Sequence, residues 1–539
     1  MGVSVINFAA MVKGFRQIAS LTAFSRVLGM LRDMAFAYFL GASGLMDSWV
    51  IAFKIPNLTR RLFGEGAASA SFIPVYSEEL QRDRREAGRL ACTVVTVVFL
   101  ILAGLVLLGE ISIWTYYTFF STHESTKLML ALTGIMLPYM VLICVVALLG
   151  GILNSHLHFA APAAAPIVLN VFIIGSLCFS GWVLVMRPTR QVFVVATAVI
   201  VAGLAQVAIQ IRPLRANGVT IRPAWHVRSE AFKKILLLMG PMVLGLTVTQ
   251  INTLADDIIA KCLSGSLDKG EFFVWFGRQI KYPLWDGAVS RLYYSQRLYQ
   301  FPLGVLGISL ATAIFPVMSA DAARKDIYAL RKTISRGLRG AVFIAIPATV
   351  GLILVARPLV STVFEHGKFT SSDTEMTAWT LSFYALGLCG YFSQQIATRA
   401  FYSTQDSKVP AFTALAAVFA NIALNLTLIW FMGTAGLALS TAICSYLQVV
   451  ILVFVLRARF GHSLLDGSVT TFVKTLIATG FMWLVGWVIL NFMKCLPVSL
   501  GFDVLRLGLV VPSAAVVYVL TAKLLRIEML SLVTGGRKA

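Results

Sequence analysis

The sequence predicts an all-α protein that crosses a membrane about fourteen times. The chain has 539 residues, of which 58% are hydrophobic and 13% charged, and its mean hydropathy is +0.83. A soluble protein of this length would leave too much of that apolar surface in contact with water. Apolar runs of about 20 residues, enough to cross ~30 Å of hydrocarbon, recur from end to end. We therefore expect a polytopic bundle of transmembrane helices.

The expected helices follow one another along the chain with short polar connections. They cover 16–41, 47–76, 90–119, 127–154, 162–185, 190–212, 231–262, 292–318, 337–356, 374–403, 409–431, 434–457, 469–492 and 503–525. Lys and Arg gather in alternate connections, whereas the intervening loops 41–47 and 432–436 contain none. Because positively charged loops stay on the cytoplasmic side, both termini are predicted to be cytoplasmic. This membrane pattern, rather than nucleic-acid binding, accounts for the formal charge of +21.

A faint internal repeat predicts two similar halves. SFIPVYSEELQRD (71–83) resembles AIFPVMSADAARK (313–325), and NSHLHFAAP (154–162) aligns with YSTQDSKVP (402–410). Both matches fall on the predicted cytoplasmic side, which indicates two lobes of six helices with pseudo-twofold symmetry along the membrane normal. The predicted division is an N-terminal lobe 1–230, a C-terminal lobe 231–460 and two additional helices in 461–539.

The segment 264–290 interrupts the series of spans. It is too charged to cross a membrane, yet it is rich in aromatic residues such as Trp275, Phe276 and Trp285. Aromatic rings mixed with Lys and Arg are typical of the membrane–water boundary. A folded exterior loop is the alternative interpretation, and both remain open at this point.

Charged side chains lie inside the second predicted span. Asp47, Lys54 and Arg61 recur at intervals of seven, and Glu65 follows four residues later, so the four share one helical face. Arg60 lies about a quarter-turn from that face. Helical phase alone therefore favours Arg61 over Arg60 as the inward-facing cation.

Further cations occupy the first and eighth spans. Arg26 and Asp33, seven residues apart, are expected to neutralise each other in part, while Arg32 and Arg297 add to the positive charge. A charge in the bilayer core costs at least ~2.5–3.5 kcal/mol, so such groups normally face a wet cavity or a partner. Guanidinium groups donate paired hydrogen bonds to phosphate oxygens, and several of them fit a diphosphate. The alternative is ion pairing between helices or extension to the membrane surface.

A second constellation carries oxygen ligands. Asp256 stands beside Asp257 in an apolar segment, Asn421 and Asn425 share a face at i, i+4, and Thr441 lies in the next span. Such oxygens suit Na⁺, and the carboxylate could instead carry a proton. Hydrogen bonds between helices are the alternative for Asn and Thr.

The sequence contains neither GxxxxGK[ST] nor HExxH, and its seven cysteines include no CxxC. We therefore expect no enzyme activity and no cofactor apart from coupled Na⁺ or H⁺. His156 and His158 have no acidic neighbours in the sequence, and we interpret them as part of a solvated loop.

Five motifs together resemble a known family. They are SRVLGMLRD (25–33), AFKIPNLTRRLFGEGAASASFIPV (52–75), RLYQFPLGVLG (297–307), FEHGKFT (364–370) and FYSTQDSKVP (401–410). They are similar to the MurJ (MviN) family of bacterial lipid II flippases, in the multidrug/oligosaccharidyl-lipid/polysaccharide exporter superfamily. The resemblance covers nearly the whole chain. It implies fourteen helices, two six-helix lobes and a groove for the polyprenyl tail formed by the last two helices.

The resemblance also implies functional residues. The family's functional arginines fall on Arg26, Arg32, Arg60 and Arg297, and its acidic position falls on Asp47. The family's cation site falls on Asp256, Asn421, Asn425 and Thr441. Some members carry an acid where this chain has Asn425, which reduces the expected affinity for Na⁺.

The implied activity is transfer of lipid II, the undecaprenyl-diphosphate-linked peptidoglycan precursor, from the cytoplasmic to the periplasmic leaflet of the bacterial inner membrane. Lipid II and membrane lipids are the expected partners, with no nucleic acid, and we expect a monomer that works beside cell-wall synthesis proteins. One alternative is a cation-coupled drug or polysaccharide-lipid exporter of the same superfamily, whose cavity should be acidic or aromatic. Another is a membrane enzyme acting on polyprenyl diphosphates, which needs carboxylate clusters for Mg²⁺ or a His nucleophile.

Overall fold

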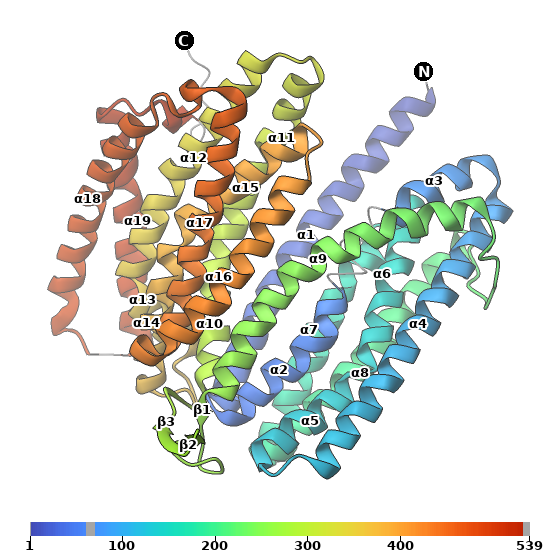
Figure 1. Cartoon of the computed structure of the whole chain (residues 1–539), viewed down its shortest axis with the longest axis horizontal. Coiled ribbons are helices and arrows are strands. Elements are labelled where there is room, and N and C mark those ends of the chain that lie inside the picture. The colour runs from blue at the N-terminus through green and yellow to red at the C-terminus, as the bar shows by residue number, and fades with distance from the viewer. Residues whose placement is uncertain (1, 61–70, 498, 532–539) are drawn as a thin grey trace. The chain divides into compact units, whose positions relative to one another are not determined.

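The computed structural model describes residues 2–60, 71–497 and 499–531. The chain forms two compact units (Figure 1). The N-terminal unit comprises residues 1–254 and 266–272, and the C-terminal unit comprises residues 255–265 and 273–539. The three-part division made from the sequence stays a prediction.

The N-terminal unit is built from long helices joined by short turns. Its helices are α1 (Gly2–Leu40), α2 (Gly44–Thr59), α3 (Ile73–Arg82), α4 (Arg84–Phe119), α5 (Glu124–Met136), α6 (Tyr139–Ser155), α7 (Ala160–Cys178) and α8 (Pro188–Ala216). A π-helical turn, Phe179–Val183, continues α7. α1 packs against α7, α2 against α5, and α8 against both α6 and α7. α9 (Glu230–Cys262) begins in this unit and ends in the other.

The C-terminal unit is also built from helices joined by short connections. Its helices are α10 (Ala288–Pro302), α11 (Ile308–Ala323), α12 (Ile327–Leu354), α13 (Ala356–Phe364), α14 (Ser371–Leu386), α15 (Leu388–Ser403), α16 (Lys408–Met432), α17 (Thr434–Phe460), α18 (Ser468–Phe492) and α19 (Leu500–Leu524). Single 3₁₀ turns lie at His462–Leu465, Met493–Cys495 and Glu528–Leu530. α16 packs against α17, and α12 contacts α15 and α18, with α19 beside α18.

Local chemistry explains several helix boundaries. Thr370 and Asp373 form a capping box in which each side chain satisfies a backbone N–H of the other at the start of α14. Gly433 separates α16 from α17 with a φ of 58°, a left-handed value that glycine adopts without strain. A π-helical turn, Leu303–Gly307, follows Pro302 and joins α10 to α11.

Within the described residues, ten helical segments are long and apolar enough to cross a membrane, and they coincide with ten of the predicted spans. The predicted spans 16–41, 47–76, 231–262 and 374–403 are outside that set. The charges of Arg26, Arg32 and Asp33 reduce the hydropathy of the first, and the last is divided at Gly387 into α14 and α15, of 16 residues each. The prediction of an all-α polytopic membrane protein is confirmed.

The segment 264–290 is folded rather than extended. β1 (Ser264–Gly265) pairs in parallel with β4 (Leu284–Trp285), and β2 (Phe272–Trp275) pairs with β3 (Arg278–Lys281). Trp275 and Phe276 at the end of β2 are largely exposed, whereas the ring of Phe273 packs against Tyr282 and Trp430. The folded-loop interpretation therefore describes its backbone, while exposed aromatic rings remain at its tip.

Candidate functional site

Among the described residues of the N-terminal unit, Arg32 is the most buried of the predicted substrate-binding arginines. Its side chain projects from α1 and is 8% exposed. Its Nη2 and Nε donate to Oδ1 of Asp33 at 2.8 and 3.1 Å, and its Nη1 donates to Oδ1 of Asn170 on α7 at 3.1 Å. Asn170 in turn donates to the carbonyl of Ser25 at 3.3 Å. These contacts hold the guanidinium in one orientation between two packed helices.

This arrangement corrects one expectation. Asp33 pairs with its neighbour Arg32, whereas the side chain of Arg26 is exposed on α1. Heptad spacing suggested a pair between Arg26 and Asp33. The long stem of Arg32 can instead bring its guanidinium back to the adjacent carboxylate.

Arg60 stands at the C-terminal end of α2 and is half-buried. Its Nε donates to Oδ1 of Asn57 at 3.0 Å, one turn earlier. The expected inward residue Arg61 lies outside the described residues, as does Glu65.

The polar face predicted for α2 begins with a deeply buried acid. Asp47 lies in the first turn of α2 and is fully buried. Lys54, two turns later, is half-buried and donates from Nζ to the carbonyl of Thr253 on α9 at 2.6 Å. The described part of this face therefore carries one anion and one cation within the helical packing of the N-terminal unit.

Arg297 belongs to the C-terminal unit, where it projects from α10 and is half-buried. Its Nη2 donates to the hydroxyl of Tyr293 at 3.1 Å, and its guanidinium carbon lies 4.7 Å from the centre of that ring. Stacking on an aromatic face suits a planar guanidinium and would suit an ammonium less well. Tyr293, one turn earlier on the same helix, therefore orients Arg297.

The four residues of the predicted cation site come together in the C-terminal unit. Asn425 Nδ2 donates to Asp256 Oδ1 at 2.6 Å and to Asn421 Oδ1 at 3.0 Å. Asn421 Nδ2 donates to Thr441 Oγ1 at 3.3 Å. Ser440, which the sequence did not indicate, donates from its hydroxyl to Asn425 Oδ1. We call these five side chains, from α9, α16 and α17, the oxygen network.

The donor chemistry of the oxygen network fits a hard monovalent cation. It combines one carboxylate with two amide and two hydroxyl oxygens, all of which are ligand types that Na⁺ accepts. The amide oxygens of Asn421 and Asn425 both accept hydrogen bonds within the network. A bound cation would replace these bonds, and a proton could bind Asp256 with less rearrangement.

Three tyrosine rings stack on one another in the same unit as Asp256. Tyr299 on α10 stacks on Tyr384 at 4.8 Å and on Tyr391 at 5.6 Å between ring centres. The charge of Asp256 acts on all three hydroxyl groups. The carboxylate is 2% exposed, so its attraction for a cation is screened little by water.

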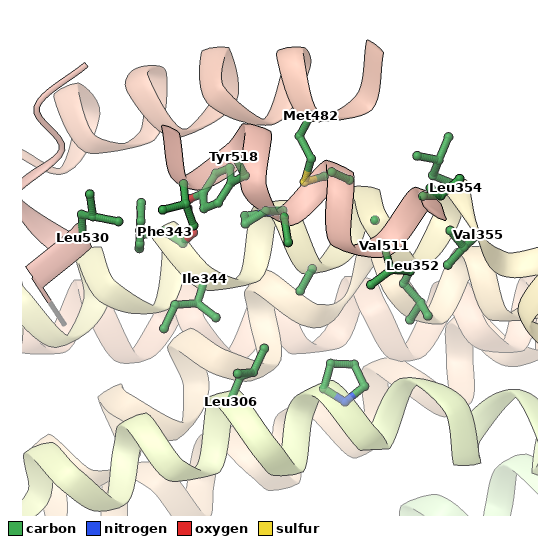
Figure 2. Close-up of a pocket in the computed structure, with 18 residues that line it drawn as sticks. Leu306, Phe343, Ile344, Leu352, Leu354, Val355, Met482, Val511, Tyr518 and Leu530 are labelled. Atoms are coloured by element: carbon green, nitrogen blue, oxygen red, sulfur yellow. The ribbon is translucent and has the colours of Figure 1, made fainter. Parts of the chain in front are cut away.

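An apolar cavity of about 530 Å³ lies in the C-terminal unit beside the last two helices (Figure 2). Most of its lining side chains come from α12, α18 and α19, and the lining includes Leu306, Phe343, Met482 and Tyr518. The hydroxyl of Tyr518 donates to the carbonyl of Phe343 at 2.6 Å, which joins α19 to α12 along one wall. We call this cavity the apolar groove, and its chemistry fits a hydrocarbon chain.

The fold is shared with other membrane proteins of known structure. It is similar to a structure titled as a multidrug resistance MATE family transporter of the MOP superfamily in an inward-facing conformation. The TM-score is 0.62, with 13% sequence identity, over 82% of this chain and 97% of that one. At this identity the likeness shows the fold alone.

The sequence comparisons are more specific. A family model described as lipid II flippase MurJ matches residues 36–505, and the chain therefore belongs to this family. A probable lipid II flippase MurJ of Vibrio cholerae is 34% identical over 448 residues, covering 81% of each chain. The lipid II flippase MurJ of Burkholderia cenocepacia is 30% identical over 491 residues, covering 88% of this chain and 89% of that one.

A solved structure titled lipid II flippase MurJ, inward closed conformation, is similar with a TM-score of 0.72. Its identity is 26%, over 94% of this chain and 98% of that chain. The resemblance to the family that the sequence motifs indicated is confirmed.

Proposed function

We propose that this protein moves lipid II from the cytoplasmic to the periplasmic leaflet of the bacterial inner membrane by alternating access. The family match over residues 36–505 carries the proposal. The cations of α1, α2 and α10 favour an anionic substrate over the cationic drugs that a related exporter would move. The apolar groove supplies a second feature that a lipid-linked substrate requires and a soluble drug does not.

In this mechanism Arg32, Arg60 and Arg297 would each donate hydrogen bonds to the diphosphate of lipid II during transport. Asn170 and Asp33 orient Arg32, Asn57 orients Arg60, and Tyr293 orients Arg297, so each guanidinium is positioned before the substrate binds. Preorganised donors lose little conformational entropy when the ligand arrives.

Three further residues complete the proposed substrate site. Arg26, which is exposed on α1, would attract the diphosphate as it approaches, and Arg61, which follows Arg60 in the sequence, would add charge. Asp47 would limit the net positive charge of the cavity when it is empty. The polyprenyl tail would remain in the apolar groove while the head group crosses.

The driving force is a separate part of the proposal. Net negative charge leaving an inside-negative cell is favoured by about 2.3 kcal/mol per charge per 100 mV. The membrane potential can therefore drive the loaded step. Na⁺ or H⁺ binding at Asp256 would then bias the return of the empty carrier, through its different affinity for the two conformations. No covalent step is required, so we propose a transporter that is not an enzyme.

The topology that fits this direction of transport has both termini in the cytoplasm. The basic connections then lie on the cytoplasmic side, as the positive-inside rule requires. We further propose that the protein acts as a monomer beside cell-wall synthesis proteins.

The test is depletion of the protein in cells followed by measurement of which leaflet contains the accumulated lipid II. Accumulation in the cytoplasmic leaflet is expected, and an unchanged distribution would contradict the proposal.

Complementation of the depleted cells then tests the substrate site. Arg297→Ala should fail to restore growth, because one charge-assisted contact contributes about 1.5–3 kcal/mol. Arg297→Lys should restore growth in part, since an ammonium keeps the charge but lacks the fork. The exposed Arg324→Ala is the control and should complement fully.

A further inference from the structure

A second cavity, in the N-terminal unit, is lined by basic residues that the transport mechanism does not use. It has a volume of about 450 Å³ and lies among α3, the first turns of α4, the end of α6 and the loop after α8. Its charged or titratable lining residues include Arg84, Arg85, Arg89, His156 and Arg222, and no Asp or Glu is among the lining residues. We call this cavity the basic pocket.

The walls of the basic pocket are held in place by hydrogen bonds. Cys92 on α4 donates from Sγ to the carbonyl of Thr220 and accepts from the backbone N–H of Arg222, both at 3.4 Å. Ala224 donates from its backbone to Thr96 on α4 at 3.2 Å. The loop that presents Arg222 is therefore attached to the helix that presents the other three arginines.

His156 forms part of the opposite wall. Its Nε2 shares a hydrogen bond of 3.0 Å with the hydroxyl of Tyr76 on α3, and its ring is half-buried. The interpretation of His156 as a solvated loop residue is therefore wrong, because α3, distant in sequence, covers it. Burial and the charge of Arg84 both lower the pKa of the His156 imidazole, as expected beside a concentration of positive charge.

Only part of this positive charge is neutralised nearby. Arg89 pairs with Glu86 at 2.6 Å, and of the four arginines it is the one with an ion pair among the described residues. Arg84 and Arg85 also open α4, where the unpaired backbone N–H groups of a helix start add positive potential. The N-cap side chain of Asp83 accepts from the backbone of Arg85 at 2.7 Å, which satisfies one of those groups.

We propose that the basic pocket is a binding site for a phosphate-bearing anion, separate from the site for the transported diphosphate. Guanidinium groups from two chain segments can contact one phosphate from two sides, with the Tyr76–His156 pair completing the polar wall. The volume falls within the range of about 300–1,000 Å³ that is usual for small-ligand sites. Arg84 is also the first residue of a candidate membrane span, so the pocket lies at one end of that helix.

Two sources share this chemistry, and two probes distinguish them. The first probe is inorganic phosphate added to the purified full-length protein in nanodiscs of phosphatidylcholine. The second is phosphatidylglycerol, mixed into the same nanodiscs in place of part of the phosphatidylcholine. The readout is the NMR signal of the His156 ring in histidine-labelled protein, assigned by its loss in His156→Asn. Tyr76, Cys92 and the four arginines are the other titratable or charged groups that line the pocket with this ring.

We expect one of the two probes to shift the His156 signal in a saturable manner. A shift with inorganic phosphate identifies a soluble phosphate compound as the ligand class, and a shift with phosphatidylglycerol alone identifies a lipid head group. Arg84→Gln and Arg222→Gln should each weaken binding about tenfold, and Arg222→Lys should weaken it less. Both positions are exposed, so the three variants should fold.

The matched control is Arg228→Gln, which removes the same charge from an exposed position outside the pocket. Binding in this variant should equal that of the unmodified protein. If neither probe shifts the signal, the proposal is wrong. It is also wrong if Arg228→Gln weakens binding as much as Arg222→Gln does, because the attraction would then be nonspecific.

Discussion

Replacing Asp256 by Asn removes the single carboxylate of the oxygen network while preserving its shape. The bond from Asn425 then changes from a charge-assisted contact, about 1.5–3 kcal/mol, to a neutral one of about 0.5–1.5 kcal/mol. The neutral amide also avoids the free-energy cost of burying a charged group, which offsets much of that loss. We therefore expect the free energy of unfolding to change by no more than about 1 kcal/mol.

Cation binding should respond far more strongly than stability does. At a Na⁺ concentration 100 times the Kd, bound Na⁺ stabilises the folded protein by about 2.7 kcal/mol, and without the carboxylate this stabilisation should nearly vanish. The assay compares thermal unfolding in NaCl and in choline chloride, followed by lipid II flipping in proteoliposomes over a range of Na⁺ and pH. Asp256→Asn should flip lipid II more slowly while binding it with unchanged affinity.

Asp257→Asn is the matched control for this experiment. Asp257 is the next residue on α9, is equally buried at 2% exposure, and lies about 100° around the helix. It should retain the Na⁺ or pH response. The coupling hypothesis is refuted if Asp256→Asn flips at the unmodified rate under all of these conditions, and the arginine site would be unaffected by that result.

Three further outcomes are expected. Asn425→Asp places a second acid beside Asp256, so NaCl should raise the thermal midpoint of this variant more than that of the unmodified protein; an equal rise would contradict the assignment. Ala515→Trp should obstruct the apolar groove and slow flipping, whereas its neighbour Val516, exposed and outside the lining, should tolerate Trp without loss of rate. Asp503→Asn should lower the free energy of unfolding by about 3–5 kcal/mol, since it removes one partner of the buried pair with Arg506; an unchanged denaturation midpoint would exclude this role.

The membrane helices could be predicted because hydropathy is a local property of the sequence. The adjacency of Asn421 and Asn425 could be predicted for a similar reason, since residues four apart share a helical face. Ser440 could not be identified in this way. It precedes Thr441 on α17 and points about 100° away from it, so a single helical face does not include both. The packing of α16 against α17 brings both hydroxyls within reach of the two amides.

The partners of Arg32 show a second limit. Asn170 lies 138 residues away on α7, and no spacing rule within α1 indicates it. Local spacing could not predict the basic pocket either, because its arginines come from α4 and from a loop more than a hundred residues later. Long-range contacts of this kind depend on which helices pack together, and local periodicity does not determine that.

In the π-helical turn Leu303–Gly307, the number of residues matters as much as their identity, because it sets the rotation of α11 relative to α10. Arg297 lies before this turn on α10, whereas Leu306, within it, lines the apolar groove. Pro302 has no backbone N–H to donate, and a π-helical turn contains one residue more than an α-helical turn. Deleting a single residue here would restore regular α-helix and rotate α11 by roughly 100° relative to α10. Substitutions in this stretch should therefore be tolerated better in natural relatives than single-residue insertions or deletions. A change in length would rotate the groove-lining residues around the helix axis relative to Arg297.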